Sequence, residues 1–270
     1  MFRIFNFHLT DSCNFRCKFC FVKKGFKPLS FSTAKIIVDR VKEYFDEKGI
    51  TDGRINIAGG EPLVSGYIQE LIDYIYSKGI RVSIITNGYL LDEKFITNNK
   101  NKVEKIGISI DSINDNTNIE LGRCDSKGRV YDYESLVKNC MLIKQYGIEL
   151  KINVVASKIN YNEDIIQLLD DVKPDRFKIL QMIPITDYAK ENALTDEEFA
   201  NYCKKYDGYL TVYENQCHIC NAYIIIDSEG KITTDNLHDR GYNIIKQKIS
   251  EVEQYIDFNQ ENENRRYIIQ

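Results

Sequence analysis

The stretch FNFHLTDSCNFRCKFCF, residues 5–21, decides the fold of this chain. Its first part, Phe5 to Leu9, alternates apolar and polar residues, which is typical of a β-strand. Cys13, Cys17 and Cys20 follow in the spacing C-x3-C-x2-C. This spacing holds three thiolates on one tight loop, where they can bind three irons of an iron–sulfur cube and leave the fourth iron open to a small molecule.

Two other interpretations of the cysteine loop are a zinc site and a set of unrelated buried thiols. Zinc needs a fourth ligand, and His8 is the only nearby candidate in the sequence. The spacing therefore favours the cluster over zinc.

Three more short motifs follow strand-like runs. GGEP (59–62) comes after Arg54–Ile57, TNG (86–88) comes after Arg81–Ile85, and Ser109-Ile110-Asp111 ends a fourth run. Each motif alone is typical of an ordinary turn. In this order behind the cysteine loop, they resemble the radical S-adenosylmethionine (SAM) superfamily.

The resemblance to that superfamily implies one 4Fe-4S cluster on the three cysteines, with SAM bound beside it. In GGEP, glycine lets the backbone approach closely and the Glu carboxylate pairs with the SAM amino group. The Asn and Ser of the next two motifs are expected at the SAM ribose or carboxylate, and an arginine at the carboxylate or a phosphate. The residues assigned to SAM in this way are Gly59, Gly60, Glu61, Asn87, Ser109 and Arg123.

The composition is that of an ordinary globular protein. The 270 residues are 43% hydrophobic and 28% charged, enough for one large domain. A net charge of −4 argues against a general nucleic-acid-binding surface. There is no apolar run of about 18 residues and no signal-peptide pattern, and eight cysteines with three on a metal loop suit a reducing compartment. We expect a cytoplasmic monomer that binds neither nucleic acid nor a membrane.

Strand-like runs alternate with helical patterns, which indicates a parallel sheet. The runs are Arg3–Leu9, Arg54–Ile57, Arg81–Thr86, Lys105–Ile110, Leu150–Val155 and Arg176–Gln181. Six strand–helix units predict an α/β fold, a partial (β/α)6 barrel of the radical SAM type, over residues 1–185. Its active site is expected at the C-terminal ends of the strands. Residues 186–270 are expected to form a C-terminal α/β extension that closes the barrel and contributes to the substrate site.

Several local features can also be predicted. Ser32 is the expected N-cap of a helix that reaches Lys48 and buries one side. In the extension we expect a helix capped by Thr195, a hairpin around residues 228–230, and a terminal helix over Tyr242–Tyr255. A loose surface segment is expected at Asn259–Asn264. The side expected to be buried in the Ser32 helix consists of Ile36, Ile37, Val41 and Tyr44.

The alternation within the strands predicts a second kind of site. Side chains at positions i and i+2 share a face, so Ile152 and Val154 should meet the helices while Lys151 faces the barrel interior. Basic side chains that converge there are costly unless paired, and a bound polyanion such as a triphosphate relieves that cost. The alternative is that some of them lie at strand ends and reach water. The inward set is Asn6, Arg54, Lys151, Asn153, Arg176 and Lys178.

Within the superfamily, residues 3–185 resemble the viperin family. The motifs that carry this resemblance are the segment 6–21, Arg54-Ile55-Asn56 before GGEP, Leu121-Gly122-Arg123, Lys151-Ile152-Asn153 and Arg176-Phe177-Lys178 followed by Gln181. The resemblance implies that a ribonucleoside triphosphate (CTP, UTP or GTP) loses its 4′ hydrogen and its 3′-hydroxyl. The product, a 3′-deoxy-3′,4′-didehydro nucleotide, terminates viral RNA chains in antiviral defence.

The viperin resemblance also implies roles for particular residues and a partner. Positions that match Asn6, Lys151, Arg176 and Lys178 hold the triphosphate, and Arg54 assists, although animal viperins typically carry a lysine there. A flavodoxin or ferredoxin is expected to deliver electrons. A family tyrosine proposed for the dehydration step aligns near Glu229, so the catalytic acid stays unknown and the preferred nucleobase stays open.

Two other functions fit parts of the pattern. A radical SAM peptide maturase or activase could use Cys203, Cys217 and Cys220 for an auxiliary cluster, although ordinary buried thiols are the preferred interpretation. Such an enzyme leaves the inward Lys/Arg set unexplained. A non-enzymatic iron–sulfur sensor leaves GGEP and Asn87 unexplained. The side chains with an expected structural, surface or loop role are Cys124, Cys140, His218 and His238.

Overall fold

The computed structural model describes residues 1–22, 29–234 and 241–265. The strands in these ranges are β1 (Ile4–Thr10), β2 (Arg54–Gly59), β3 (Arg81–Thr86), β4 (Val103–Ser109), β5 (Glu149–Ala156), β6 (Arg176–Gln181), β7 (Thr211–Glu214), β8 (Ile224–Ile226), β9 (Lys231–Thr234) and β10 (Tyr242–Asn243). They form one sheet in the order β10-β9-β8-β1-β2-β3-β4-β5-β6-β7. Strands β1 to β7 run parallel, and β8 pairs in parallel with β1.

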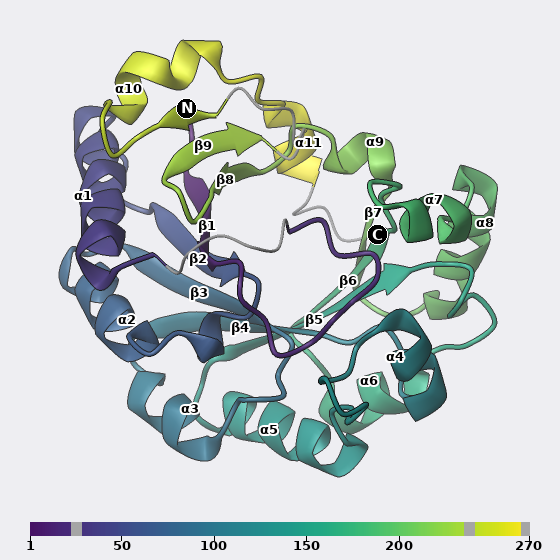
Figure 1. Cartoon of the computed structure of the whole chain (residues 1–270). Helices are drawn as coiled ribbons and strands as arrows, with labels where there is room; N and C mark the ends of the chain where they lie inside the picture. Colours follow the sequence, from purple (N-terminus) through teal and green to yellow (C-terminus); the bar gives the residue numbers. More distant parts are fainter. Residues whose placement is uncertain (23–28, 235–240, 266–270) are drawn as a thin grey trace.

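The helices in the described ranges lie mainly between consecutive strands. They are α1 (Phe31–Glu47), α2 (Ile68–Ser77), α3 (Glu93–Asn99), α4 (Asp115–Leu121), α5 (Tyr133–Gln145), α6 (Ile166–Val172), α7 (Asp187–Asn192), α8 (Asp196–Cys203), α9 (Gln216–Ile219), α10 (Ile249–Val252) and α11 (Gln260–Arg265). Helices α1 to α8 surround the curved sheet (Figure 1). The predicted partial α/β barrel is confirmed.

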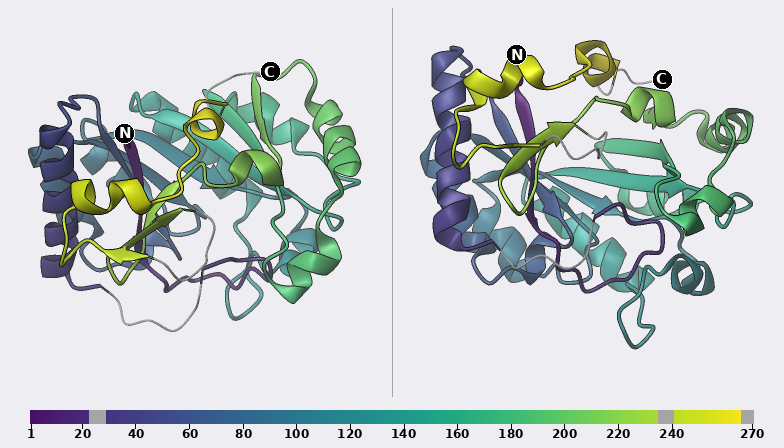
Figure 2. Two further views of the ribbon diagram at one scale, coloured as in Figure 1. Left: turned by 90° about the horizontal axis from the view of Figure 1, so that it is seen from above. Right: turned by 45° about the horizontal axis from the view of Figure 1, so that its top comes forward.

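Over the described residues the barrel is not closed, and the edge strands of its sheet are β7 and β10. Strand β7 pairs with β6 and β8 pairs with β1, and within the described ranges no ladder joins β7 to β8. The chain after β7 crosses this side: β8 and β9 form the expected hairpin beside β1, and α10 packs against α1 (Figure 2). The extension therefore continues the same sheet.

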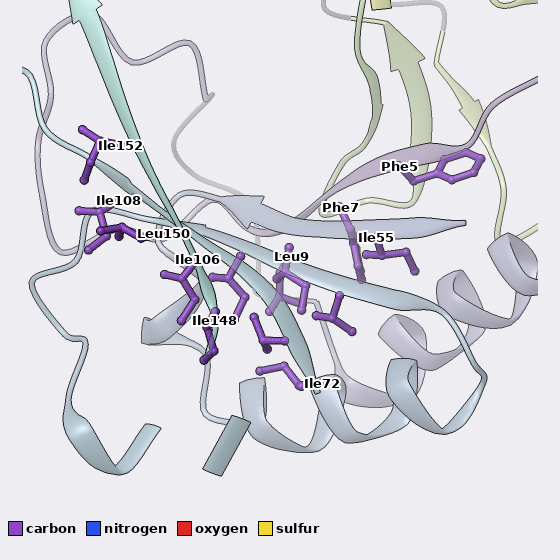
Figure 3. Close-up of a cluster of buried hydrophobic side chains, with 14 of the residues drawn as sticks. Phe5, Phe7, Leu9, Ile55, Ile72, Ile106, Ile108, Ile148, Leu150 and Ile152 are labelled. Atoms are coloured by element: carbon purple, nitrogen blue, oxygen red, sulfur yellow. The ribbon is translucent and has the colours of Figure 1, made fainter. Parts of the chain in front are cut away.

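The hydrophobic core lies between the outer face of the sheet and the helices. Phe7, Leu9 and Ile55 point from β1 and β2 toward the helices, where Ile72 of α2 meets the same cluster (Figure 3). Ile152 belongs to this core too and is fully buried. Successive side chains of a strand point to opposite faces, so the residues that alternate with these apolar ones face the inside of the barrel.

Helix α1 corrects two predictions. Its N-cap is Ser30, whose hydroxyl accepts a hydrogen bond from the Thr33 N–H, so the helix begins two residues before the expected one. Ile36 is 43% exposed although it was expected on the buried side. Successive helical residues are 100° apart, and the buried stripe is centred on Ile37 and Val41.

The C-terminal segment departs more from the sequence predictions. Tyr242–Tyr255 is not one helix, because it contains β10, a turn and the short helix α10. Asn259–Asn264 is not a loose segment: most of it forms α11, where Asn262 donates to the carbonyls of Cys217 and Cys220. Helices α4, α7 and α9 and strand β7 were not expected.

Other local predictions are confirmed. Thr195 caps α8 through a capping box with Glu198.

His238 lies outside the described residues. In the described part of the chain, no helix combines the length and apolar character needed to cross a bilayer.

The two neighbouring isoleucines of α1 test this packing. Ile37→Ala should lower the free energy of unfolding by about 2–5 kcal/mol, because Ile37 is fully buried. Ile36→Ala should change it by less than about 0.5 kcal/mol. Chemical denaturation of both variants measures the difference, and equal losses would contradict the assigned face.

Candidate active site

The sequence motifs meet at one end of the barrel. The cysteine loop follows β1, GGEP follows β2, TNG follows β3 and Asp111 follows β4, so all four leave the C-terminal ends of neighbouring parallel strands. The Asn87 side-chain amide donates to Asn14 Oδ1 at 2.8 Å and lies 3.8 Å from Cys13 Sγ. The expected grouping of the motifs is therefore present.

Two glycines allow close packing on the cysteine loop. A Cβ on Gly60 would collide with the Ser12 carbonyl, and one on Gly122 with the Arg16 carbonyl. Gly122 also has φ +75°, which favours glycine. Backbone bonds Glu61 N to Ser12 O (2.8 Å) and Arg16 N to Gly122 O (3.1 Å) hold the loop from both sides.

The cysteine loop fits a cluster better than a single metal ion. Among the described residues, no three or more His, Cys, Asp or Glu side chains are arranged to hold one ion. Zinc needs all its thiolates within about 2.3 Å of one point, whereas a cubane binds each thiolate through a different iron. His8 packs its ring near Phe21, and burial lowers its pKa to about 4.

Partial burial of Cys13 and Cys17 favours their neutral thiols over the thiolates that a metal binds. Burial raises the pKa of Cys17 to about 12 and also raises the pKa of Cys13. A metal's positive charge stabilises thiolates in such surroundings. Three thiols lie on one loop, and glycines let the neighbouring backbone pack closely against that loop. This arrangement suits a 4Fe-4S cluster.

Glu61 is held in place by donors within the protein. Its carboxylate is fully buried and accepts hydrogen bonds from Thr86 Oγ1 (2.7 Å), Asn87 N (2.7 Å) and Leu63 N (3.1 Å). These contacts tie GGEP to the TNG turn and fix the position of the Glu61 carboxylate.

Arg123 is held beside the cysteine loop by Asp111. The two side chains form a buried ion pair, and Asp111 also accepts a hydrogen bond from Val155 N at 2.8 Å. The Arg123 charge lies close enough to Cys17 to act on its pKa. Ser109 is half-buried at the end of β4. Both residues lie at the motif end of the barrel, as expected.

A second, deeper group of polar residues lies inside the barrel. One pocket is lined by Arg54, Asn56, Ser83, Ile85, Lys105, Lys151, Arg176 and Lys178. The alternation argument is thus confirmed for the four basic residues that it turned inward. Asn6 and Asn153 adjoin this group: Asn6 Oδ1 accepts from Asn56 at 3.0 Å, and Asn153 is in register with Lys178.

Strand register orders these residues in tiers. Asn6, Asn56, Ser83, Lys105 and Glu149 are successive partners across β1 to β5. Two residues further along the strands, Gly107, Lys151 and Arg176 are partners. The pocket therefore lies toward the N-terminal ends of the strands, beneath the edge that carries the motifs.

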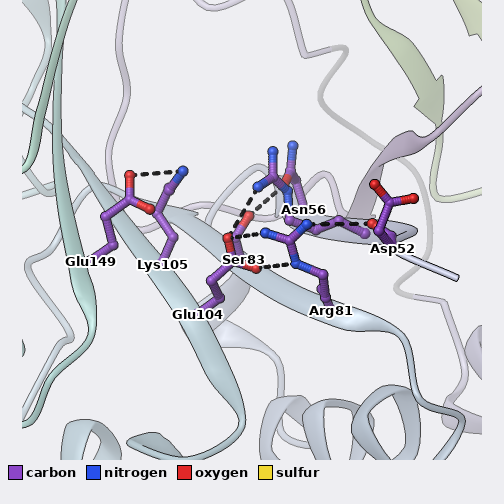
Figure 4. A network of polar contacts seen from close by, with 8 residues as sticks. Asp52, Asn56, Arg81, Ser83, Glu104, Lys105 and Glu149 are labelled. Carbon is purple, nitrogen blue, oxygen red and sulfur yellow. Dashed lines mark hydrogen bonds and ion pairs between the residues drawn. The ribbon is translucent and has the colours of Figure 1, made fainter. Parts of the chain in front are cut away.

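Protein carboxylates contact three of the cations that line the pocket. Lys178 forms a buried ion pair with Glu214 and donates to the Tyr223 hydroxyl at 2.6 Å, and that hydroxyl donates to Glu214. Lys105 pairs with Glu149 at 2.8 Å. Arg54 lies 3.4 Å from Glu104, which also binds Arg81 (Figure 4).

A local irregularity places Glu104 in this network. Val82 pairs with Val103 and Ser83 pairs with Lys105, so Glu104 is an extra residue in β4. Such a bulge re-aims a side chain. Here the Glu104 carboxylate reaches both Arg54 and Arg81.

The sequence reasoning missed several pocket residues. Ser83 and Lys105 could have been predicted from the alternation of their strands. Ser83 lies four residues before Asn87, and Lys105 lies four residues before Ser109, so each should share a face with a motif residue. Glu104 depends on the bulge, and Glu214 and Tyr223 lie beyond the last strand expected in the barrel. Their positions follow from pairing between distant segments.

The remaining candidates lie apart from this pocket. Glu229 is on the β8–β9 turn, where its carboxylate binds Lys231 at 2.9 Å. Its neighbour Ser228 donates to Asp11 of the cysteine loop at 2.9 Å, which brings the turn to the motif end. Cys217 and Cys220 are exposed, and Cys203 and Cys140 are buried.

Known proteins resemble the chain in sequence and fold. The radical SAM superfamily model matches residues 7–172. An S-adenosylmethionine-dependent nucleotide dehydratase of Flammeovirga pacifica is 34% identical over 242 residues, 84% of this chain and 80% of that protein. The dehydratase RSAD2 of Oncorhynchus mykiss is 29% identical, over 82% of this chain and 66% of its own length.

Solved structures share the fold at low sequence identity. Native anSMEcpe with bound AdoMet has a TM-score of 0.71 and 16% identity, covering 97% of this chain and 82% of that one. Streptococcus suis SuiB bound to S-adenosylmethionine has a TM-score of 0.69 and 18% identity, and the match covers 97% of this chain and 67% of that one. At these identities the likeness concerns the fold alone.

Gly60→Ala tests the packing against the cysteine loop. The added methyl group meets backbone, so we expect a strain of about 1–3 kcal/mol and a much lower iron content after anaerobic reconstitution. Gly66→Ala is the matched control, because nothing lies within 4 Å of its added Cβ. Equal iron content in the two variants would contradict the close approach.

Proposed function

The chain belongs to the radical SAM superfamily and, within it, to the family of S-adenosylmethionine-dependent nucleotide dehydratases, and we propose that it dehydrates a ribonucleoside triphosphate. The proposed product is the 3′-deoxy-3′,4′-didehydro analogue. Superfamily members use a 4Fe-4S cluster and SAM, and the cysteine loop fits that cluster. When bound, the two supply a carbon radical that can take the 4′ hydrogen of a nucleotide.

The chain's own residues position the reactants at the motif end. Cys13, Cys17 and Cys20 would hold the cluster. Gly59, Gly60 and Glu61 would orient the methionine part of SAM, with Asn87 and Ser109 near its ribose or carboxylate. Arg123, oriented by Asp111, would meet the SAM carboxylate or a phosphate. The protein contributes mainly positioning and exclusion of water.

The deeper pocket would hold the triphosphate, and this arrangement of basic residues is the observation that carries the proposal. Arg54, Lys151, Arg176 and Lys178 surround one pocket inside the barrel. Asn56 precedes Gly59, the last residue of β2, by three residues, a span of about 10 Å at 3.3 Å per residue. A nucleotide can therefore keep its phosphates in the pocket while its ribose lies near the motif edge.

The extension would complete the nucleotide site. We propose residues 1–185 as the radical SAM barrel and residues 186–270 as the segment that closes it. This is supported by Glu214 and Tyr223, which contact Lys178 from beyond the predicted barrel. Asn6 and Asn153 would add polar contacts, and Glu229 stays a candidate for the proton transfer that accompanies loss of the 3′-hydroxyl. An electron donor of the flavodoxin or ferredoxin type and a cytoplasmic monomer stay predictions.

The other two functions explain less. A peptide maturase gives no reason for basic residues to converge inside the barrel. A sensor gives no reason for the GGEP and TNG motifs. The relatives' names also agree with the nucleotide substrate.

Nucleotide-dependent SAM cleavage tests the proposal. Reconstituted protein with SAM and dithionite should release 5′-deoxyadenosine faster with CTP, UTP or GTP. Lys151→Ala should raise the KM for that nucleotide about tenfold or more, because one charge-assisted contact is lost. Slow nucleotide-independent cleavage should persist.

Lys158→Ala is the control for Lys151→Ala, since Lys158 is an exposed lysine that follows the same strand. Release that ignores every nucleotide would refute the function. Full nucleotide coupling in Lys151→Ala would refute the phosphate assignment.

A further inference from the structure

Lys105 is a buried cation that the known motifs leave unassigned. It is 7% exposed, lies on β4 and lines the same pocket as Arg54, Lys151, Arg176 and Lys178. Its ammonium group binds Glu149 of the neighbouring strand (Figure 4). Burying the lysine of such a pair gains little stability compared with apolar packing, so Lys105 calls for a functional explanation.

The carboxylates around the pocket differ in how easily they can leave. The Glu214 side chain is 2% exposed and is held by Lys178 and Tyr223. The side chains of Glu149 and Glu104 are 33% and 29% exposed. A carboxylate that already touches water can swing outward at little cost, whereas moving the sealed one requires that the barrel open.

The pocket also has too little room for a phosphate chain as it stands. Its volume is about 30 Å³, enough for one or two water molecules. A triphosphate therefore requires that side chains move apart. Glu149 and Glu104 are the charged groups best placed to do so, and their departure frees the facing cations for a new anion.

We propose that Lys105 is a further triphosphate-binding residue and that Glu149 holds its ammonium group until the terminal phosphate of the nucleotide replaces the carboxylate. This inference rests on the proposed function. Glu149 is thus a placeholder anion that stabilises the substrate-free pocket and competes with the substrate. Lys105 is the group that distinguishes a triphosphate from a diphosphate.

Strand register explains why the terminal phosphate is the expected partner. Lys105 precedes Gly107, the register partner of Lys151, by two residues, so it lies about 7 Å deeper than the Lys151–Arg176 tier. The ribose must lie near the motif edge for its 4′ hydrogen to react. Phosphates that extend from it reach Lys151 and Arg176 before they reach Lys105.

The electrostatics of Lys105 agree with this role. Burial lowers its pKa, Glu149 opposes that change, and the charges of Arg54 and Arg176 lower the pKa further. The ammonium group thus lies within the field of two other cations. A phosphate there interacts with all three and can replace the stabilisation that Glu149 supplies.

Binding measurements on two variants test the proposal. Equilibrium dialysis of reconstituted protein with SAM would use the tightest-binding of CTP, UTP, GTP and ATP, together with its diphosphate. Lys105→Met should weaken triphosphate binding about tenfold or more and diphosphate binding much less. Glu149→Gln should leave triphosphate binding unchanged or strengthen it, because the competing charge is gone.

Lys102→Met is the matched control, since Lys102 is a surface lysine that binds Asp73 outside the pocket. Thermal unfolding shows whether each variant is folded. Equal losses for triphosphate and diphosphate in Lys105→Met, or no loss, would overturn the proposal. So would parallel losses in Lys105→Met and Glu149→Gln, because they would indicate a purely structural pair.

The outcome separates this inference from the proposed function. If Lys151→Ala weakens nucleotide binding while Lys105→Met does not, the inference fails and the function stands. If the unmodified protein binds none of the four triphosphates, both fail.

Discussion

Charge on the inner face of a parallel sheet is the constraint on which this structure depends. Apolar residues at alternate strand positions build the core against the helices, so the remaining positions must face the barrel interior. In this chain several of them are lysine or arginine. Buried cations are tolerated only with counter-charges. Glu104, Glu149 and Glu214 supply counter-charges within the protein, and the proposed triphosphate would supply more.

The same strands connect the two parts of the site. Their C-terminal ends carry the cysteine loop and the motifs that follow it, and their N-terminal halves carry the basic pocket. Rigid strands fix the distance between these parts better than loops could. Glu61 adds to that rigidity because its carboxylate joins two motif turns. In the proposed function, one sheet would thereby place the nucleotide's reacting carbon and its phosphates relative to the cluster.

Much of this arrangement could be predicted from local sequence. The bounds of β3 and β6 agree with the predictions, and the parity of Lys151 and Lys178 follows from their apolar neighbours. The contacts of Glu214 could not be predicted, since β7 is short and its place beside β6 depends on distant pairing. The Glu104 bulge is likewise a property of two strands together. In α1, Ser30 and Ser32 are both good caps, and only the packing chooses between them.

A crystal structure of the reconstituted protein with SAM and a nucleoside triphosphate tests the central claim most directly. The account predicts the phosphates inside the barrel, in contact with Lys151 and Arg176, and the ribose toward the cysteine loop. Phosphates bound on the outer surface would contradict it. So would an interior in which the substrate-free ion pairs persist and no phosphate enters.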